Sequence, residues 1–184
     1  SWSSAAWTML VGLVITLPFM VVSGVPSGLA ENVWWMLLAG VGNVGGLVLA
    51  GLGYRIGKVG VITPILATEG AISAVIAALL GESIAPIVAF LLMVIVLGIV
   101  IAAVAPDPEP LEHERPVLAV ALATAAALAF GGSLFAIGHL SSALPISWVL
   151  LPPRLVGVVA LTIPLALTGR LLLTRRTTPL VISM

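Results

Sequence analysis

The chain has 184 residues, of which 61% are hydrophobic and only 8% are charged, and its mean hydropathy is +1.29. Soluble domains carry about a quarter charged residues, so this composition excludes an ordinary water-soluble domain and makes lipid the solvent for most of the chain. The formal net charge is zero and cysteine is absent, which argues against a nucleic-acid partner and excludes disulfides and thiolate metal sites.

Six apolar stretches are long enough to cross the hydrocarbon core of a bilayer, which takes about 20 residues of helix. In chain order they are residues 5–23, 33–54, 59–80, 84–105, 116–138 and 146–169. Each run is continuous rather than alternating, and a segment in lipid must satisfy its own backbone hydrogen bonds. The predicted fold class is therefore all-α, a polytopic transmembrane helix bundle, and the expected location is the cell membrane (inner or plasma membrane), crossed several times.

The longest polar connection, APDPEPLEHERP at 105–116, divides the predicted spans into two groups. Residues 1–105 hold four spans, 106–115 form an acidic surface loop rich in proline, and 116–184 hold two spans. The other connections are short, so neighbouring helices are expected to form antiparallel hairpins. The chain starts Ser-Trp-Ser-Ser without an initiator methionine or a basic segment, which does not resemble a signal peptide and suggests an internal fragment.

An internal repeat relates the first and last spans. Residues 10–24 read LVGLVITLPFMVVSG and residues 155–169 read LVGVVALTIPLALTG. Aligned without gaps, Leu10, Val11, Gly12, Val14 and Gly24 match Leu155, Val156, Gly157, Val159 and Gly169, while Pro18 and Pro164 miss each other by one place. Chance matches are the alternative in such low-complexity sequence. A true repeat separated by five crossings would be inverted, as in many secondary transporters.

One acid, Glu69, lies near the middle of the third predicted span, in ILATEGAISAVIAALLGES. A carboxylate at the centre of a membrane helix costs about 2.5–3.5 kcal/mol on insertion scales, so it is expected to face a cavity or a partner. Desolvation disfavours its charged form, and it could therefore bind and release a proton near neutral pH. The alternative is a neutral carboxyl that is hydrogen-bonded between helices.

The second predicted span contains AGVGNVGGLVLAGLG, in which residues 40–45 spell GxGxxG. That pattern signifies a dinucleotide site only in a strand-to-helix turn, so it is discarded here. Gly42, Gly46 and Ala50 instead repeat the small-xxx-small spacing that lets membrane helices approach closely. Asn43 could form a hydrogen bond across that contact or into a cavity.

Arg154 follows two prolines, about nine residues into the last predicted span. Its guanidinium could extend to the near interface or pair with a carboxylate such as Glu69 inside the bundle. No Ser/His/Asp set, HExxH motif or P-loop lysine occurs in the sequence. We therefore expect neither an enzyme nor a metal site nor a bound cofactor.

The stretch GYRIGKVGVITPILATEGAISAVIAALLGESIAPIVAFLLMVIVLGIVIAAV resembles EamA-type members of the drug/metabolite transporter superfamily. Leu80-Gly81-Glu82 matches the triplet that closes a helix there, and Glu69 falls where some members carry the Glu of a Glu-Pro pair, although Gly70 replaces the proline here. WVLLPPRLVGVV is similar to a later span of the family, with Arg154 where members commonly have arginine. The resemblance implies ten helices in two inverted halves, of which this chain would hold about the second to the seventh.

Two criteria for membrane orientation disagree. The connections near 54–58, 105–116 and 170–176 lie on one side of the predicted topology and hold Arg55, Lys58, Arg115, Arg170, Arg175 and Arg176. The positive-inside rule assigns that side to the cytoplasm, whereas the family resemblance implies the opposite orientation.

The expected function is a secondary active transporter that exports small metabolites, amino acids or drugs by alternating access, with proton coupling as an option. Glu69, Asn43, Thr68 and Arg154 are the predicted substrate- or proton-binding residues. A small-molecule substrate and the lipid bilayer are the expected partners, and the sequence does not predict an oligomeric state. The alternatives are a membrane scaffold or assembly subunit without a transport cycle, and a membrane enzyme acting on lipid.

Overall fold

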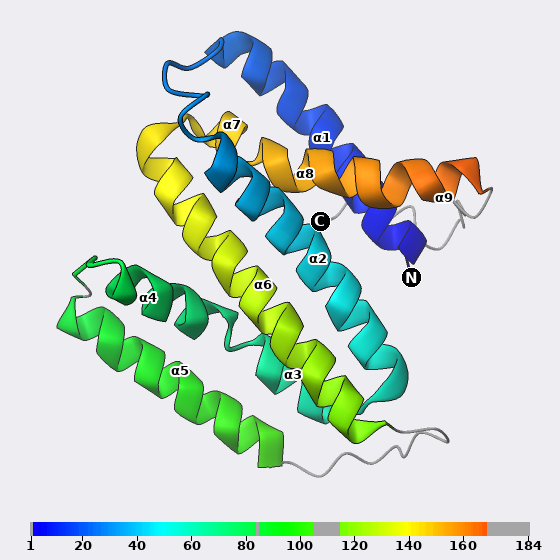
Figure 1. Cartoon of the computed structure of the whole chain (residues 1–184), viewed down its shortest axis with the longest axis vertical. Helices are drawn as coiled ribbons and strands as arrows, with labels where there is room; N and C mark the ends of the chain where they lie inside the picture. Colours follow the sequence, from blue (N-terminus) through cyan, green and yellow to red (C-terminus); the bar gives the residue numbers. More distant parts are fainter. Residues whose placement is uncertain (1, 84, 105–114, 169–184) are drawn as a thin grey trace. The chain divides into compact units, whose positions relative to one another are not determined.

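The computed structural model describes residues 2–83, 85–104 and 115–168, and the regular elements in these residues are all helical (Figure 1). They fall into two compact units: unit 1 takes in the described residues of 1–44 and 137–184, and unit 2 those of 45–136. The helices are α1 (Trp2–Ser23), α2 (Val33–Ile56), α3 (Val59–Leu66), α4 (Glu69–Leu79), α5 (Pro86–Val104), α6 (Pro116–Ala143), α7 (Ile146–Val149), α8 (Leu151–Gly157), the π-helical turn η1 (Val158–Thr162) and α9 (Ile163–Leu167).

Five helical segments in the described residues are long and apolar enough to span a membrane, which confirms the all-helical, multi-pass prediction. They are Trp2–Ser23, Val33–Ile56, Val59–Leu79, Pro116–Ala143 and Ile146–Leu167. The predicted span at 84–105 corresponds to α5, whose apolar stretch Pro86–Ile101 belongs to a shorter class of helix. The total of six spans therefore stays a prediction.

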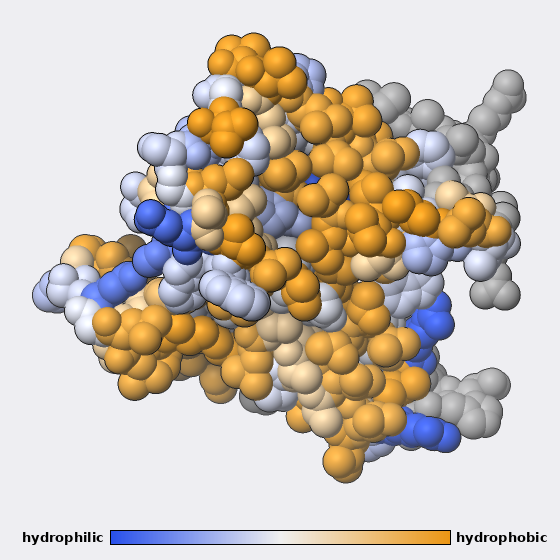
Figure 2. Space-filling view, turned by 45° about the horizontal axis from the view of Figure 1, so that its top comes forward, coloured by the Kyte–Doolittle hydropathy of each residue, from blue (hydrophilic) through white to orange (hydrophobic). Residues whose placement is uncertain are grey.

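Large apolar side chains cover much of the protein surface, as Figure 2 shows for one face. In α5, Phe90 is 59% exposed and Met93 is 71% exposed, and near the end of α1 Val22 is 89% exposed. A soluble monomer rarely exposes contiguous apolar patches of more than a few hundred Å². These helix faces therefore suit contact with lipid acyl chains.

In unit 1, α1 packs against the last span, Ile146–Leu167, and the two run in opposite directions. At the end of α1, the Ser23 hydroxyl lies 3.1 Å from that of Ser147, and Trp148 Nε1 donates to the Gly24 carbonyl over 2.9 Å. At the start of α1, the Ala6 carbonyl accepts a 3.0 Å hydrogen bond from Thr162 Oγ1. The end of one segment meets the start of the other, so the pair is antiparallel.

The last span is irregular because prolines interrupt its backbone ladder. Pro152 and Pro153 occupy the first turn of α8, where a missing N–H costs little. Pro164 comes later, and the residue four places before it loses its usual donor. The backbone widens into η1 just before Pro164, and π-turns of this kind are often found at functional sites.

In unit 2, α3 is anchored by a small apolar cluster while the predicted span at 59–80 breaks into two helices. Buried Ile62 packs with Ala119 and Ala123 of α6, and α5 packs against α3 and α4. A two-residue turn at Ala67–Thr68, whose dihedrals stay in the right-handed helical region, separates the two helices. Together they form the apolar segment Val59–Leu79, which confirms the predicted span. Pro64 removes one donor from this stretch, and Thr68 Oγ1 donates to the Ile65 carbonyl over 2.6 Å, a side-chain bond that competes with the helix.

Candidate functional site

Glu69 and Thr68 lie together at the interruption between α3 and α4. α3 ends at Leu66 and α4 begins at Glu69, so Thr68 takes the N-cap position of α4. The Thr68 hydroxyl makes no capping bond to α4 and turns back to Ile65 instead. The acid that the sequence places in the middle of a membrane span is thus the first residue of a half-helix.

The interruption places backbone groups of both signs within the span. The first N–H groups of α4 have no partner within their own helix, and they carry the positive end of the helix dipole. The last carbonyl groups of α3 likewise lack N–H partners within their own helix, and they carry the negative end of its dipole. Glu69 is half-buried at this junction, where a helix N-terminus favours a carboxylate.

Gly131 of α6 holds the first turn of α4 in place. A Cβ atom on Gly131 would lie 2.5 Å from Ile72 Cγ2 and 3.0 Å from the Glu69 carbonyl oxygen. Only a residue without a side chain allows the backbone of α6 to approach α4 this closely. Sequence reasoning missed this contact, because a glycine in an apolar helix carries no signal of the partner it meets.

Arg154 directs its guanidinium toward the middle of α1 rather than toward the end of a helix. A Cβ atom on Gly12 would overlap Arg154 Nη1 and would lie 2.9 Å from Cζ. Gly12 is buried and is the eleventh of the 22 residues of α1. This position favours the interior interpretation of Arg154 over the one in which the guanidinium extends to the near interface.

The charge of Arg154 is poorly compensated within unit 1. Its Nε atom is buried and has no hydrogen-bond partner among the described residues. Asn43, half-buried in α2, also belongs to unit 1, whereas Thr68 and Glu69 belong to unit 2. The predicted pairing of Arg154 with Glu69 would join the two units and stays a prediction.

The two segments of the predicted internal repeat contact each other reciprocally. In the ungapped alignment Met9 is equivalent to Arg154, and Gly12 to Gly157. Arg154 lies over Gly12, and Met9 lies over Gly157, where a Cβ atom would be 2.6 Å from Met9 Cγ. The contacting residue, Met9 or Arg154, lies three places before the glycine of its own segment and packs on the glycine of the other segment. A local two-fold relation produces this pattern, as it does in isologous interfaces.

The π-turn accounts for the one-place offset between the two prolines. A π-turn inserts one residue into an α-helix, and η1 lies between the matched glycine and the proline of the second copy. With that insertion, Thr16-Leu17-Pro18 aligns with Thr162-Ile163-Pro164. Both threonines are buried. The predicted match of Gly24 with Gly169 belongs to the alignment without this insertion, and Gly169 lies outside the described residues.

The glycine-rich face of α2 is only partly used for packing. A Cβ atom on Gly46 would lie 2.8 Å from the Phe130 ring, and Ala50 is buried, whereas Gly42 is half-buried. A closer approach in unit 1 occurs at Gly40, where a Cβ atom would meet the Pro152 carbonyl oxygen at 2.8 Å. The residues of the discarded GxGxxG pattern therefore include one that fits tightly against another backbone.

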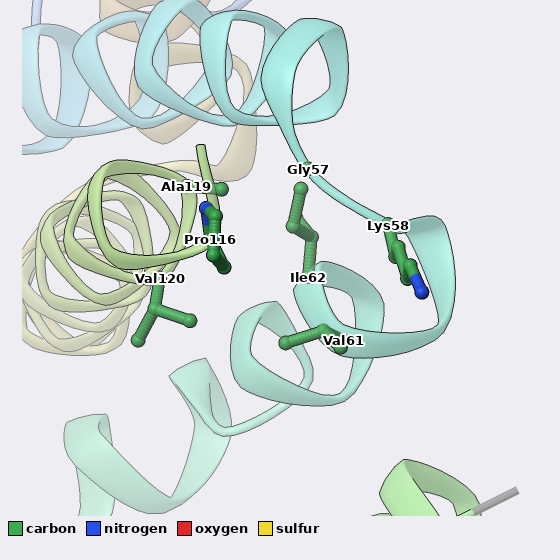
Figure 3. A pocket seen from close by; sticks show the side chains of 7 residues that line it. All are labelled: Gly57, Lys58, Val61, Ile62, Pro116, Ala119 and Val120. Atoms are coloured by element: carbon green, nitrogen blue, oxygen red, sulfur yellow. The ribbon is translucent and has the colours of Figure 1, made fainter. Parts of the chain in front are cut away.

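A small cavity in unit 2 lies apart from the predicted site residues (Figure 3). Its volume is ≈ 190 Å³, below the roughly 300–1,000 Å³ of typical ligand pockets. The residues that line it are Gly57, Lys58, Val61, Ile62, Pro116, Ala119 and Val120. This cavity is too small and too apolar to be the principal binding site.

Metal ions in proteins are bound by groups of His, Cys, Asp or Glu side chains. Within 2–83, 85–104 and 115–168, no group of three or more His, Cys, Asp or Glu side chains could hold a metal ion. The candidate site thus consists of Glu69 with Thr68 at a helix interruption in unit 2, and Arg154 over Gly12 in unit 1. Comparison with family models, curated proteins and solved structures finds no match to this chain.

Proposed function

We propose that this chain is part of a secondary active transporter of the EamA type, which exports small metabolites, amino acids or drugs across the cell membrane by alternating access. The single observation that carries the proposal is the position of Glu69. It is an ionisable residue inside a membrane span, at the point where that span is interrupted.

Both features of that position favour transport over a purely structural role. Ionisable residues in membrane spans generally face a partner or a water-filled passage. Interrupted helices in transporters bring helix ends, with their unpaired backbone groups, to the substrate and to coupling ions. Glu69 combines the two, and in this proposal its carboxyl group binds either the cargo or a coupling proton.

The packing of α1 against the last span supports alternating access. Transporters with inverted repeats move one half against the other around a site between them. Here the two repeat copies run antiparallel and meet through reciprocal glycine contacts at Gly12 and Gly157. In the proposed cycle the two halves rotate against each other about this contact.

The scaffold alternative has one observation in its favour. A carboxylate at the start of a helix is stabilised by the N–H groups and the dipole of that helix, so Glu69 could cap α4 without taking part in any cycle. The transporter and the scaffold differ in the expected effect of replacing Glu69 by a neutral side chain of the same shape: only the transporter should lose activity.

The test is export from cells that produce the full chain, preloaded either with ethidium or with radiolabelled amino acids. We expect Glu69→Gln to abolish export of the transported compound, while Glu82→Gln, at an exposed acid after the end of α4, leaves it intact. A protonophore that stops export by the wild type would identify proton coupling. Unchanged export by Glu69→Gln, at equal protein levels, would contradict the assignment of Glu69.

A further inference from the structure

The geometry points to Arg154 as the binding point for an oxyanion, so that the cargo carries a carboxylate or phosphate group. This inference deepens the proposed function, on which it rests. The observations that carry it are the depth of the guanidinium, its unsatisfied donor and the scarcity of acids in unit 1.

The guanidinium lies where a free cation is costly. It packs on Gly12 at the midpoint of α1, and Arg154 itself is the ninth of 22 residues in the last span. A charged group in an apolar setting costs several kcal/mol unless it is paired. The glycine under it lets the guanidinium reach this depth instead of stopping at the helix surface.

Unit 1 does not supply the missing acceptor. Its sequence contains a single acid, Glu31, because residues 1–30, 32–44 and 137–184 include neither Asp nor Glu. Glu31 is exposed in the connection that follows α1, whereas the guanidinium lies midway along that helix. The hydroxyl of Thr16 donates to the Gly12 carbonyl and that of Thr162 to the Ala6 carbonyl, and neither accepts a hydrogen bond from Arg154 Nε.

A second unpaired donor lies on the same pair of helices. Among the described residues, the buried side-chain nitrogen atoms without a hydrogen-bond partner are Arg154 Nε and Trp7 Nε1. Trp7 follows Ala6, which contacts Thr162, and precedes Met9, which contacts Gly157. Both atoms are N–H donors without acceptors, and the charged one, Arg154 Nε, fits a ligand that brings only acceptors.

Arginine suits a carboxylate or phosphate because its planar fork of N–H groups can make two parallel hydrogen bonds to either group. The same chemistry is found in a free anionic metabolite and in the headgroup of a phospholipid. The site is therefore defined by the oxyanion, and the lipid composition of the experiment distinguishes the two sources.

The test measures binding to the purified full chain in dodecyl maltoside micelles, which contain no phosphate or carboxylate group, by isothermal titration calorimetry. The probes are benzoate and phenyl phosphate, with benzamide as a neutral control of nearly the same shape as benzoate. We expect one or both anions to bind and benzamide to bind at least about tenfold more weakly, since a hydrogen bond to a charged group is lost. Equal binding of benzoate and benzamide, or no binding of either anion, would overturn the proposal without any mutant.

The variants then assign the binding to Arg154. Arg154→Gln should weaken anion binding by about tenfold or more, and Arg154→Lys by a smaller factor, because the charge is kept but the fork is lost. Arg115→Gln, at an exposed arginine before α6, is the matched control and should bind as the wild type does. Full anion affinity in a folded Arg154→Gln protein would overturn the proposal.

Two further arms separate the rival explanations. If phosphatidylglycerol added to the micelles lowers the benzoate affinity of the wild type and not that of Arg154→Gln, the site stands and its oxyanion is a lipid headgroup. If the wild type binds no anion but Glu69→Gln does, Glu69 is the partner of Arg154 and the oxyanion site is refuted. Anion binding together with unchanged export by Glu69→Gln would leave the site in place and refute only the assignment of Glu69.

Discussion

Two regions of this protein place a polar group in an apolar span, and they do so by different means. In unit 2 the helix itself is interrupted, and Glu69 starts the second half at a point where backbone N–H groups are available. In unit 1 the guanidinium of Arg154 crosses to a neighbouring helix and occupies the space over Gly12. The acid thus has stabilising groups within its own chain segment, whereas the base does not.

This difference bears on how each residue can function. A carboxylate at a helix N-terminus is stabilised by the N–H groups of that helix, so Glu69 does not require a ligand at this position. An unpaired guanidinium gains most from a ligand that brings the missing acceptor. In the proposed function, Glu69 contacts the proton or cargo at the interruption, and Arg154 selects the charge of the cargo where α1 crosses the last span.

The largest effect is expected at the contact that positions the interruption. Gly131→Ala places a Cβ atom against Ile72 and the Glu69 carbonyl, and overpacking of this kind costs about 1–3 kcal/mol. Thermal unfolding in detergent should show a lower midpoint, accompanied by loss of export.

The matched control is Gly138→Ala in the same helix, where nothing lies within 4 Å of the added atom. It should be neutral or slightly stabilising, because alanine has the higher helix propensity. Equal midpoints for the two variants would mean that α6 does not hold α4 at Gly131.

A more selective effect is expected at Gly12. In Gly12→Ala the new Cβ atom overlaps the end of the Arg154 side chain, which can move aside because it is long and flexible. Stability should therefore fall by less than in Gly131→Ala, while benzoate affinity in micelles should fall severalfold because the guanidinium is displaced.

Gly45→Ala in α2, at a position with open space around it, is the control for a glycine replaced within a membrane helix. A Gly12→Ala protein that binds benzoate as the wild type does would indicate that the depth of the guanidinium is irrelevant to anion binding.

The smallest effect is expected from Thr68→Val, which keeps the shape of the side chain and removes the 2.6 Å hydrogen bond to the Ile65 carbonyl. One such bond contributes about 0.5–1.5 kcal/mol. We expect a small drop in the unfolding midpoint and a slower but measurable export, since Glu69 stays at the start of α4.

Thr124→Val removes a comparable hydroxyl bond to a backbone carbonyl, that of Val120 in α6, and should leave export unchanged. Complete loss of export in Thr68→Val would instead assign the Thr68 hydroxyl a direct part in binding.

Much of the architecture could be predicted from hydropathy alone. The positions of five spans followed from runs of apolar residues long enough to cross a bilayer. The break at Thr68 could not be read from the same pattern, because Pro64 also occurs inside α3 without ending it. Which proline or threonine interrupts a helix depends on the neighbouring helices that satisfy the freed backbone groups.

Some candidate residues could be identified from the sequence, and others only from the structure. An acid and an arginine in apolar spans stand out in any sequence, so Glu69 and Arg154 were identified without coordinates. Gly131 and Gly157 were not identified as contacts, since the sequence has 19 glycines and nothing local distinguishes them. The one-residue offset of the prolines in the repeat was explained only by the π-turn at Val158–Thr162.

The sequence by itself determined that this is a multi-pass helical membrane protein, because the cost of placing polar backbone and charged side chains in lipid depends on composition and run length alone. The tertiary structure decided that Glu69 begins a half-helix and that the guanidinium of Arg154 rests on the middle of α1. Those outcomes depend on close approach between segments up to 142 places apart in the chain, as for Gly12 and Arg154. Such packing is fixed by the shapes of both partners together.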